Sequence, residues 1–374
     1  MKKDIALIHF SPLEYYPPVT NLINYISENS YNIKSLTVFS THNNKSRLEF
    51  SNKCAKILRV KLSNVKSNRL IRFFRYVYFQ LFVIIKLIYL KPDKILYYES
   101  ISSFPAYIYH SFFNNKVKIF IHYHEYFSND HYTNVSMKIE KYFHKLEKNY
   151  IYQNAVWISH TNKQRLTLFK SDYPILNDKI LKMLPNYPPS NWQNYIVNYN
   201  NKPIKVIYIG SLSFESTYIK EFCNWIVKQN GKVIFNIYSY NLDKETFLYL
   251  KNIKSAFIIF FDNGIEYNEI PKILAKHDVG VILYKPFSIN FINNVTNKFY
   301  EYYACGIDIW FSKTMKSTYQ HINPKTYPRV IPLDFTRLNF FNWQKAIDRT
   351  GLKKSKENFY CEDVYKELVE ELRS

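Results

Sequence analysis

Short apolar runs alternate with segments of helical periodicity along the first half of the chain. The strand-like runs are DIALIHF from Asp4, IKSLTVFS from Ile33, AKILRV from Ala55, DKILYYES from Asp93, VKIFIHYH from Val117 and AVWISH from Ala155. Strands that alternate with helices indicate βαβ units and a parallel sheet with helices on both faces. The N-terminal MKKDIALIHF contains an acid and has no small-residue cleavage site, so it predicts a first buried strand rather than a signal peptide.

A second series of the same kind follows a Pro- and Asn-rich passage, residues 184–203, which is the clearest linker in the sequence. Its strand-like runs are IKVIYIG, GKVIFNIYS, SAFIIFF, VGVILY and DIWFS. We therefore predict an α/β chain of two Rossmann-like doubly wound domains, residues 1–195 and 196–374, facing a cleft. Ligands of open parallel sheets bind at the carboxyl ends of the strands, so we expect the chemistry at the strand ends that face this cleft.

Charge narrows the class of partner. The 374 residues include 51 Lys and Arg against 30 Asp and Glu, a net charge of +21, and such an excess favours nucleic acid, a membrane or a phosphorylated substrate. A compositional bias towards lysine is the alternative explanation. The excess is concentrated, since residues 45–94 hold thirteen Lys and Arg and only two acids.

Within this stretch, RLIRFFRYVYFQLFVIIKLIYL predicts a basic amphipathic helix. Arg69, Arg72 and Arg75 share one arc of a helical wheel with Gln80 and Lys86, and the other face is aromatic and aliphatic. The segment is too short and too charged to span a bilayer, but it has the composition of a helix that lies in the membrane interface. A core helix with a basic outer face is the equally supported alternative.

The segment NVTNKFYEYYACGIDIWFS, from Asn294, predicts a loop, a short helix, a glycine stop and a strand. Asn297 and Lys298 fall at the start of the helix, where free N–H groups, the helix dipole and an ammonium all favour a phosphate. Glu301, one turn later on the same face, has two oxygens that accept from the vicinal hydroxyls of a ribose. The pattern indicates a nucleoside-diphosphate site, and an ordinary amphipathic helix is the alternative.

These residues carry a family resemblance. The segment NKFYEYYACG, preceded by HDVGVILY from His277, resembles the donor site of GT-B fold glycosyltransferases, especially the bacterial group 1 or family 4-like enzymes. IKVIYIGSLS from Ile204 resembles the phosphate-side glycine loop of their C-terminal domain. KPDKILYYES, FIHYHEYFS and LPNYPP resemble their N-domain strands and hinge, so the resemblance covers most of the chain.

The resemblance implies roles for individual residues. Glu301 would bind the donor ribose, Asn297 and Lys298 would lie near the diphosphate, and the backbone at Gly210 and Ser211 would approach the phosphates. His124 would face the transferred sugar with Glu125 beside it, and His122 on the same strand face is a rival candidate. The last helix, residues 361–374, would cross back to the first domain, unless it is a surface helix of the second.

Two positions depart from the family pattern. Many members carry a carboxylate eight positions before the ribose-binding Glu, where this chain has Asn293, so the retaining or inverting outcome stays open. The first strand-to-helix loop, HFSPLEYYPPV from His9, contains no glycine, although a close backbone approach to a substrate favours one.

We therefore expect a hexosyltransferase that moves a sugar from a nucleoside-diphosphate sugar to an oligosaccharide or polyprenyl-linked acceptor, as in capsule or O-antigen synthesis. No Asp-x-Asp triplet and no His/Cys ligand spacing is present, so we expect metal independence and no cofactor. The four scattered cysteines favour a reducing compartment, and we expect a cytoplasmic protein peripheral to an anionic inner membrane face. A sugar-nucleotide epimerase of the same fold and a catalytically silent GT-B-like protein are the alternatives, whereas a nucleic-acid partner lacks any binding motif.

Overall fold

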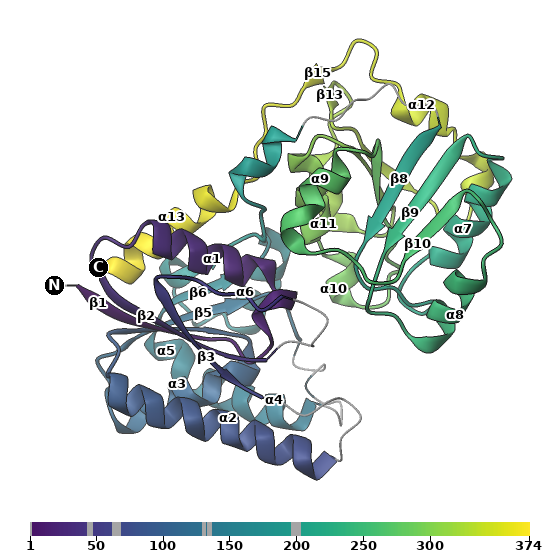
Figure 1. Cartoon of the computed structure of the whole chain (residues 1–374). Helices are drawn as coiled ribbons and strands as arrows, with labels where there is room; N and C mark the ends of the chain where they lie inside the picture. Colours follow the sequence, from purple (N-terminus) through teal and green to yellow (C-terminus); the bar gives the residue numbers. More distant parts are fainter. Residues whose placement is uncertain (1, 43–47, 62–68, 129–131, 133–136, 196–202) are drawn as a thin grey trace. The chain divides into compact units, whose positions relative to one another are not determined.

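The computed structural model describes residues 2–42, 48–61, 69–128, 132, 137–195 and 203–374 (Figure 1). The chain divides into two compact units, Met1–Pro185 with Cys361–Ser374 and Asn186–Tyr360. The boundary between the two units along the chain therefore lies after Pro185, whereas we predicted it at residue 195. The reason is that Trp192 is buried in the core of the second unit with Ile207 and Phe299.

The first unit contains a seven-stranded parallel sheet with the order β3-β2-β1-β4-β5-β6-β7. Its strands are β1 (Lys3–Ile8), β2 (Ile33–Thr41), β3 (Ala55–Val60), β4 (Lys94–Tyr98), β5 (Lys118–Tyr123), β6 (Ala155–His160) and β7 (Leu181–Met183). All six strands predicted for this half are present. The pattern missed β7, which is only three residues long and has no buried position.

Helices cover both faces of this sheet (Figure 1). They are α1 (Pro17–Glu28), α2 (Arg69–Leu90), α3 (Ser103–Phe112), α4 (Lys138–Leu146), α5 (Tyr152–Asn154), α6 (Lys163–Asp172) and α13 (Cys361–Arg373). Helix α1 pairs with α13, and α3 lies beside both α2 and α4. Phe79, Val83 and Leu87 of α2 are buried in one core with Ile95 and Ile121 of the sheet.

The terminal helix α13 is an integral part of the first unit. Its Leu368, Val369 and Leu372 are fully buried, and the Tyr365 hydroxyl donates to the Pro18 carbonyl at 2.8 Å. At the start of the central strand β4, Lys94 is 1% exposed and donates to the Glu371 carbonyl of this helix, and burial lowers its pKa to about 8. Helix α13 therefore completes the first unit.

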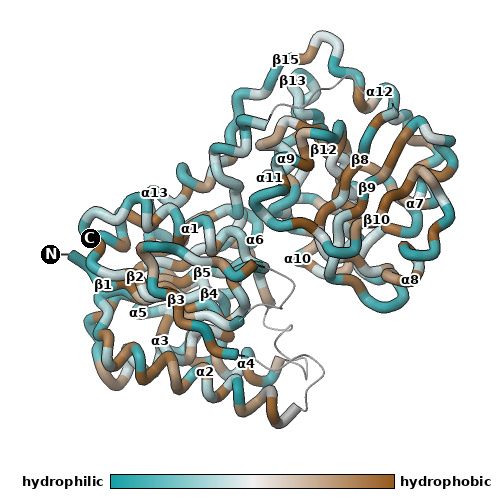
Figure 2. Tube along the Cα trace, viewed as in Figure 1, coloured by the Kyte–Doolittle hydropathy of each residue, from teal (hydrophilic) through white to brown (hydrophobic). Residues whose placement is uncertain are grey.

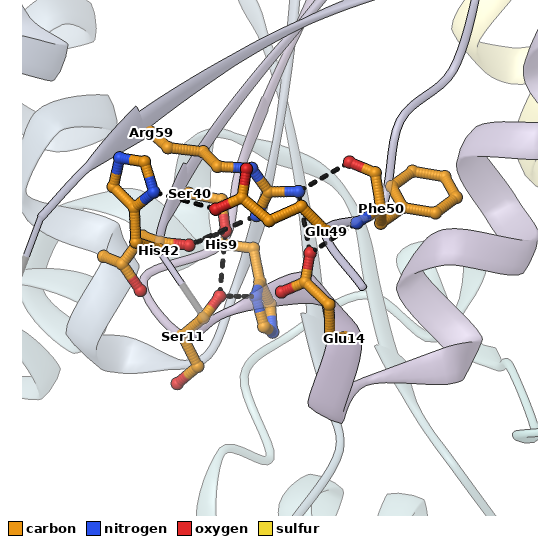
Figure 3. Close-up of polar contacts among 9 residues, drawn as sticks. His9, Ser11, Glu14, Ser40, His42, Glu49, Phe50 and Arg59 are labelled. Atoms are coloured by element: carbon orange, nitrogen blue, oxygen red, sulfur yellow. Dashed lines mark hydrogen bonds and ion pairs between the residues drawn. The ribbon is translucent and has the colours of Figure 1, made fainter. Parts of the chain in front are cut away.

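A buried ion pair holds the glycine-free loop that follows β1 (Figure 3). Arg59 Nη2 lies 2.8 Å from Glu14 Oε1, and both side chains are less than 10% exposed. The same carboxylate accepts from the Phe50 N–H at 2.7 Å, and the Ser40 hydroxyl donates to the Ser11 carbonyl at 3.0 Å. Side-chain hydrogen bonds from β2 and β3 thus fix a loop in which no glycine is needed.

The second unit contains a six-stranded parallel sheet with the order β10-β9-β8-β11-β12-β14. Its strands are β8 (Ile204–Ile209), β9 (Val233–Tyr238), β10 (Ile258–Phe261), β11 (Val279–Ile282), β12 (Asp308–Ser312) and β14 (Val330–Leu333), with a separate pair β13 (Thr326–Tyr327) and β15 (Lys353–Lys354). Hydrophobic residues dominate β8, β9 and β10 (Figure 2). All five strands predicted for this half are present, and the missed β14 is an edge strand that contains Pro332.

The helices of the second unit lie over two apolar cores, one on each face of the sheet. They are α7 (Ile219–Lys228), α8 (Lys244–Asn252), α9 (Ile270–Leu274), α10 (Ile289–Ile292), α11 (Asn297–Ala304) and α12 (Trp343–Ile347). Helices α7 and α8 contribute to one core, and α9 and α11 to the other. Two doubly wound parallel sheets are the predicted fold class, which is confirmed.

Helix α11 approaches the sheet closely because β11 carries a glycine beneath it. A Cβ atom added to Gly280 would lie 2.1 Å from Cδ2 of Tyr302, so no side chain fits between strand and ring. The ring is fully buried, and its hydroxyl accepts from the Ile209 N–H at 3.3 Å. This contact fixes α11 against the carboxyl half of β8.

We expect Gly280→Ala to destabilise the second unit by about 1–3 kcal/mol, the range for overpacking a core. Urea unfolding followed by tryptophan fluorescence measures this, since Trp192, Trp225, Trp310 and Trp343 lie in the second unit. Tyr302→Phe is the matched control, since it keeps the ring and loses one hydrogen bond worth about 1 kcal/mol. A Gly280→Ala variant as stable as the unmodified protein would contradict the close approach.

Candidate functional site

The first group of predicted residues lies at the start of α11. Thr296 is the N-cap, its hydroxyl accepting from the Phe299 N–H at 3.3 Å, and Asn297 is the first helical residue. The Asn297 Oδ1 accepts from Asn186 Nδ2 at 3.0 Å. The helix stops before Gly306 and β12 follows, so the predicted order of loop, helix, glycine and strand is confirmed. The first-turn N–H groups of the helix therefore stand where an anion binds best.

Lys298 lies between two tyrosine rings. Its Nζ donates to the Tyr284 hydroxyl at 3.2 Å and lies 5.5 Å from the centroid of the Tyr208 ring. Burial lowers the pKa of Lys298, but the nearby phenols of Tyr284 and Tyr208 raise it more, so its pKa lies above the ordinary value. The ammonium is therefore charged at neutral pH.

The glycine after β8 lies directly beside this lysine. Gly210 has φ +128°, a conformation that a side chain disfavours, and an added Cβ would lie 2.8 Å from both Cε and Nζ of Lys298. Ser211 follows it and is exposed, and its carbonyl accepts from the Tyr208 hydroxyl at 2.7 Å. The structure thus brings the β8 loop and the start of α11 together at the carboxyl ends of two parallel strands.

Glu301 lies one turn after Lys298 and is 7% exposed. Burial raises its pKa to about 7, and the Lys298 charge opposes that rise. Among the described residues, no group donates a hydrogen bond to its carboxylate. The oxygens of this buried carboxylate can therefore accept hydrogen bonds from the hydroxyls of a ligand.

Two further positions near α11 are already engaged by protein groups. Asn293, where the family pattern has a carboxylate, caps the C-terminus of α10 and is half-buried. Lys285 donates to the Phe214 carbonyl at 2.6 Å and pairs with Glu221 at 3.6 Å, so it ties its loop to α7. Lys298 is therefore the cation at the start of α11 that the sequence singled out.

The second group of predicted residues lines a cavity of about 330 Å³ in the first unit. His124 and Glu125 follow β5 directly, and both line this cavity. His122 does not belong to the lining: it is 1% exposed, its Nδ1 lies 2.9 Å from the Ser159 hydroxyl, and burial lowers its pKa to about 3. Of the two rival histidines, His124 is therefore the one that a ligand in the cavity meets.

The His124 ring and backbone are both fixed. The ring stacks on Tyr98 with centroids 5.3 Å apart and an interplanar angle of 17°, and the centroid of the Tyr16 ring lies 5.5 Å away. Its carbonyl accepts from the Arg165 guanidinium and from the Thr161 hydroxyl. A histidine held this firmly is suited to orienting a substrate.

Glu99 is a site residue that the sequence analysis missed. It follows β4 with φ +61°, a backbone conformation that costs a non-glycine residue about 1–3 kcal/mol. Its Oε1 accepts from the backbone N–H groups of His124 at 2.6 Å and Glu125 at 3.4 Å. Burial and the nearby Glu125 carboxylate raise its pKa to about 8. Its position at the carboxyl end of a parallel strand is the signal that would have identified it.

The third group, the arginines of α2, lies mostly outside the described side chains. The backbones of Arg69 and Arg72 belong to α2, but their side chains are not among the described groups, and Arg75 is half-buried. Gln80, from the same predicted arc, is 3% exposed and donates to the Ile101 carbonyl at 3.3 Å. The described part of this arc, Gln80 and Arg75, therefore does not form the outer face of α2.

The outer face of α2 is apolar instead. We call it the α2 apolar face; its residues, each 47–82% exposed, are Ile71, Phe74, Tyr78, Leu81, Ile85 and Tyr89. The window Phe73–Leu90 has a mean hydropathy of 1.6, which by length and composition suffices to cross a membrane, contrary to our expectation. However, the opposite face of the same helix is buried in the core of the first unit.

Comparison with known proteins gives the fold. No protein-family model and no curated protein sequence matches the chain. Solved structures do: HepE from Anabaena in complex with UDP and glucose has a TM-score of 0.66 and 11% identity over the whole of both chains. Sucrose-phosphate synthase from Thermosynechococcus elongatus has a TM-score of 0.62 and 14% identity over all of this chain and 95% of that one.

The chain has the GT-B fold. The resemblance to GT-B proteins stated from the sequence is thereby confirmed at the level of fold. A UDP-GlcNAc 2-epimerase from Neisseria meningitidis bound to UDP-GlcNAc also matches, with a TM-score of 0.58 and 12% identity over 98% of this chain and 99% of that one. Sugar transfer and sugar epimerisation therefore both occur on this fold. Only the residues of the site, and not the fold, can distinguish between the two reactions.

We expect the Glu99→Gln variant to be more stable than the unmodified protein at high pH, but not at low pH. Between its ordinary pKa of 4.5 and its raised pKa of about 8, native Glu99 holds a proton that the unfolded chain has lost. The free energy of unfolding therefore falls across this range, and the neutral amide removes that loss. The variant should melt at about the same temperature near pH 5 and about 10 °C or more higher at pH 8.5, because a pKa rise from 4.5 to about 8 corresponds to roughly 5 kcal/mol and each kcal/mol shifts melting by about 2–4 °C in a unit of this size.

Thermal melts of both proteins across this pH range check the prediction. Glu28→Gln is the control, since Glu28 is an exposed glutamate of the same unit. Parallel pH profiles for Glu99→Gln and the unmodified protein would show that Glu99 is ionised in the native state.

Proposed function

We propose that this GT-B protein is a glycosyltransferase that moves a hexose from a nucleoside-diphosphate sugar to a saccharide or lipid-linked saccharide. The convergence of Gly210, Lys298 and Glu301 in the second unit carries the proposal. The positive-φ Gly210 and the charged Lys298 ammonium suit a diphosphate. The buried Glu301 carboxylate, one helical turn after Lys298, suits the ribose that follows the diphosphate.

In this reaction negative charge develops on the leaving diphosphate. The N–H groups of the first turn of α11 and the Lys298 ammonium supply fixed positive charge to that group, which lowers the barrier without reorganisation. Glu301 accepts from the ribose hydroxyls and sets the register of the nucleotide. These groups neutralise the diphosphate, so we propose a metal-independent transfer with no cofactor.

Uridine is the base we favour. Two structures of the same fold contain UDP or a UDP-sugar, HepE with UDP and glucose and the Neisseria meningitidis epimerase with UDP-GlcNAc. Because this chain has the same fold at low identity, the nucleotide is a proposal for it, and binding measurements decide it.

An epimerase acting on a UDP-sugar is the second candidate, because three of the similar structures of this fold are UDP-GlcNAc 2-epimerases. The α2 apolar face favours the transferase. An enzyme that converts one soluble nucleotide sugar into another has no use for a lipid surface, whereas a lipid-linked acceptor lies in one.

We further propose that the protein works at the cytoplasmic face of the cell membrane, with the acceptor bound by the first unit. The α2 apolar face lies in a stretch rich in Lys and Arg, a combination that suits an anionic bilayer surface. A polyprenyl-linked saccharide of capsule or O-antigen synthesis is the acceptor class consistent with this placement.

We expect UDP to raise the melting temperature of the protein equally with magnesium and with EDTA, because a ligand of the native state stabilises it. Glu301→Gln should weaken UDP binding about tenfold, which corresponds to about 1.4 kcal/mol for lost ribose hydrogen bonds. Calorimetric titration measures the affinity, and Glu245→Gln, an exposed change in the same unit, should leave it unchanged. Unaltered affinity in Glu301→Gln would remove Glu301 from the ribose site, and no binding of UDP, GDP, CDP or dTDP would favour a silent protein.

Mass balance separates the two candidate reactions. A transferase given UDP-sugar and membrane-extracted acceptor releases UDP in step with a lengthened acceptor. An epimerase forms an isomeric UDP-sugar and releases no UDP. Chromatography of the nucleotide pool resolves both products, and isomer formation alone would overturn the transferase proposal.

We expect Leu81→Asp/Ile85→Asp to lower partition onto vesicles of phosphatidylcholine and phosphatidylglycerol at least tenfold. Each change removes an exposed apolar side chain worth about 1.5–3 kcal/mol when buried. The control is Ile175→Asp/Met183→Asp, two exposed apolar residues of the same unit outside α2. Equal co-sedimentation of the two double variants would show that the α2 apolar face does not meet the bilayer.

A further inference from the structure

The cavity of the first unit carries a charge opposite to that of the chain as a whole. Its lining includes three glutamates from three segments: Glu99 after β4, Glu125 after β5 and Glu140 on α4. No lysine or arginine belongs to the described lining, although the chain carries a net charge of +21. Glu99 holds its proton at neutral pH because its pKa is raised to about 8, so the field that favours a cation here comes from Glu125 and Glu140.

Aromatic rings complete the wall of the cavity. Tyr16, Phe127 and Tyr132 belong to its lining. Tyr132 is held in place, because its ring stacks on His144 with centroids 4.2 Å apart and an angle of 7°, and its hydroxyl lies 3.2 Å from the Ser100 hydroxyl. Fixed ring faces attract ammonium groups and also cover the apolar face of a sugar.

A second, smaller chamber of about 10 Å³ adjoins the cavity and shares Glu125, Phe127 and Tyr132 with it. His160 lines this chamber and is 1% exposed, and neither of its ring nitrogens forms a hydrogen bond with any described group. Burial lowers the pKa of His160 to about 3, so the ring is neutral and presents one donor and one acceptor. The chamber has about the volume that one water-sized polar group occupies.

We propose that this cavity binds a positively charged group of the acceptor, the ammonium of an amino sugar. The inference rests on the proposed transferase function and names the class of acceptor. The ammonium pairs with Glu125 and Glu140, the sugar ring lies against Tyr16 or Phe127, and a polar substituent reaches the chamber beside His160. Charge-assisted hydrogen bonds to carboxylates are roughly twice as strong as neutral ones, so the amine contributes much of the affinity.

The same lining excludes other acceptors. A phosphate or uronate group would meet the Glu125 and Glu140 carboxylates and lose affinity through like-charge repulsion. A neutral sugar would gain the ring contacts but no ionic partner. Selection for the amine therefore comes from repulsion of anions as well as attraction of the cation.

Calorimetric titration of the full chain with a chitosan tetramer and with cellotetraose tests this. The two probes share linkage and length and differ in the amine that replaces a hydroxyl on each sugar. We expect at least tenfold tighter binding of the chitosan tetramer. Glu125→Gln/Glu140→Gln should reduce that preference to within about twofold, and the control Glu28→Gln/Glu370→Gln, two exposed glutamates of the same unit that do not line the cavity, should retain it.

Equal affinity for the two tetramers, or a preference that survives the Glu125→Gln/Glu140→Gln change, overturns the inference. General electrostatic attraction does not imitate a positive result, because a net charge of +21 repels a polycation. UDP binding is measured separately, so UDP binding without a tetramer preference refutes only the amino-sugar inference. A tetramer preference without binding of any nucleoside diphosphate supports the cavity and refutes the transferase.

Discussion

The contact between Tyr302 and the bare backbone of Gly280 determines where the donor-side residues lie. Because no Cβ separates them, α11 lies close to the sheet, and the Tyr302 hydroxyl reaches the last residue of β8. Because α11 lies so close to the sheet, Lys298 lies beside Gly210, and Glu301, one turn later in the helix, is buried. A helix held farther out by the width of one methyl group would separate the ammonium from the glycine loop. The arrangement we assign to the nucleotide thus depends on a packing constraint and not on a polar bond.

The first unit achieves the same precision by other means. Its loop after β1 contains no glycine and is held by the buried Arg59–Glu14 pair and by hydrogen bonds from neighbouring strands. Breaking a buried pair by removing one partner typically costs about 3–5 kcal/mol, so such a loop is rigid. It carries Ser11 and Tyr16 to the cavity wall, where the Tyr16 ring lies 5.5 Å from the His124 ring. The two units therefore differ in how they fix their strand ends, one by close packing and one by buried polar groups.

The sequence predicted the strands well because parallel strands buried on both faces are continuous apolar runs. It also predicted the start of α11 and the neighbourhood of Gly210 and Lys298, through capping rules and family resemblance. It missed Glu99, whose importance comes from a positive φ and from N–H donors 25 and 26 residues away, neither of which a local pattern reveals. It also left open which face of α2 packs on the core. Both sides of that helix are rich in apolar residues, and a helical wheel does not say which side the core takes.

The position of α13 makes the second unit an insertion within the first. The chain leaves the first unit at Pro185, builds all of Asn186–Tyr360, and only then supplies the helix that covers β1 and α1. During synthesis the N-terminal unit is therefore the last to be completed, although most of its residues are made first. Until Leu368 and Leu372 emerge, the apolar surface that they bury stays exposed. Loss of α13 would thus damage the unit that contains the first strand of the chain, not the unit that precedes α13 in the sequence.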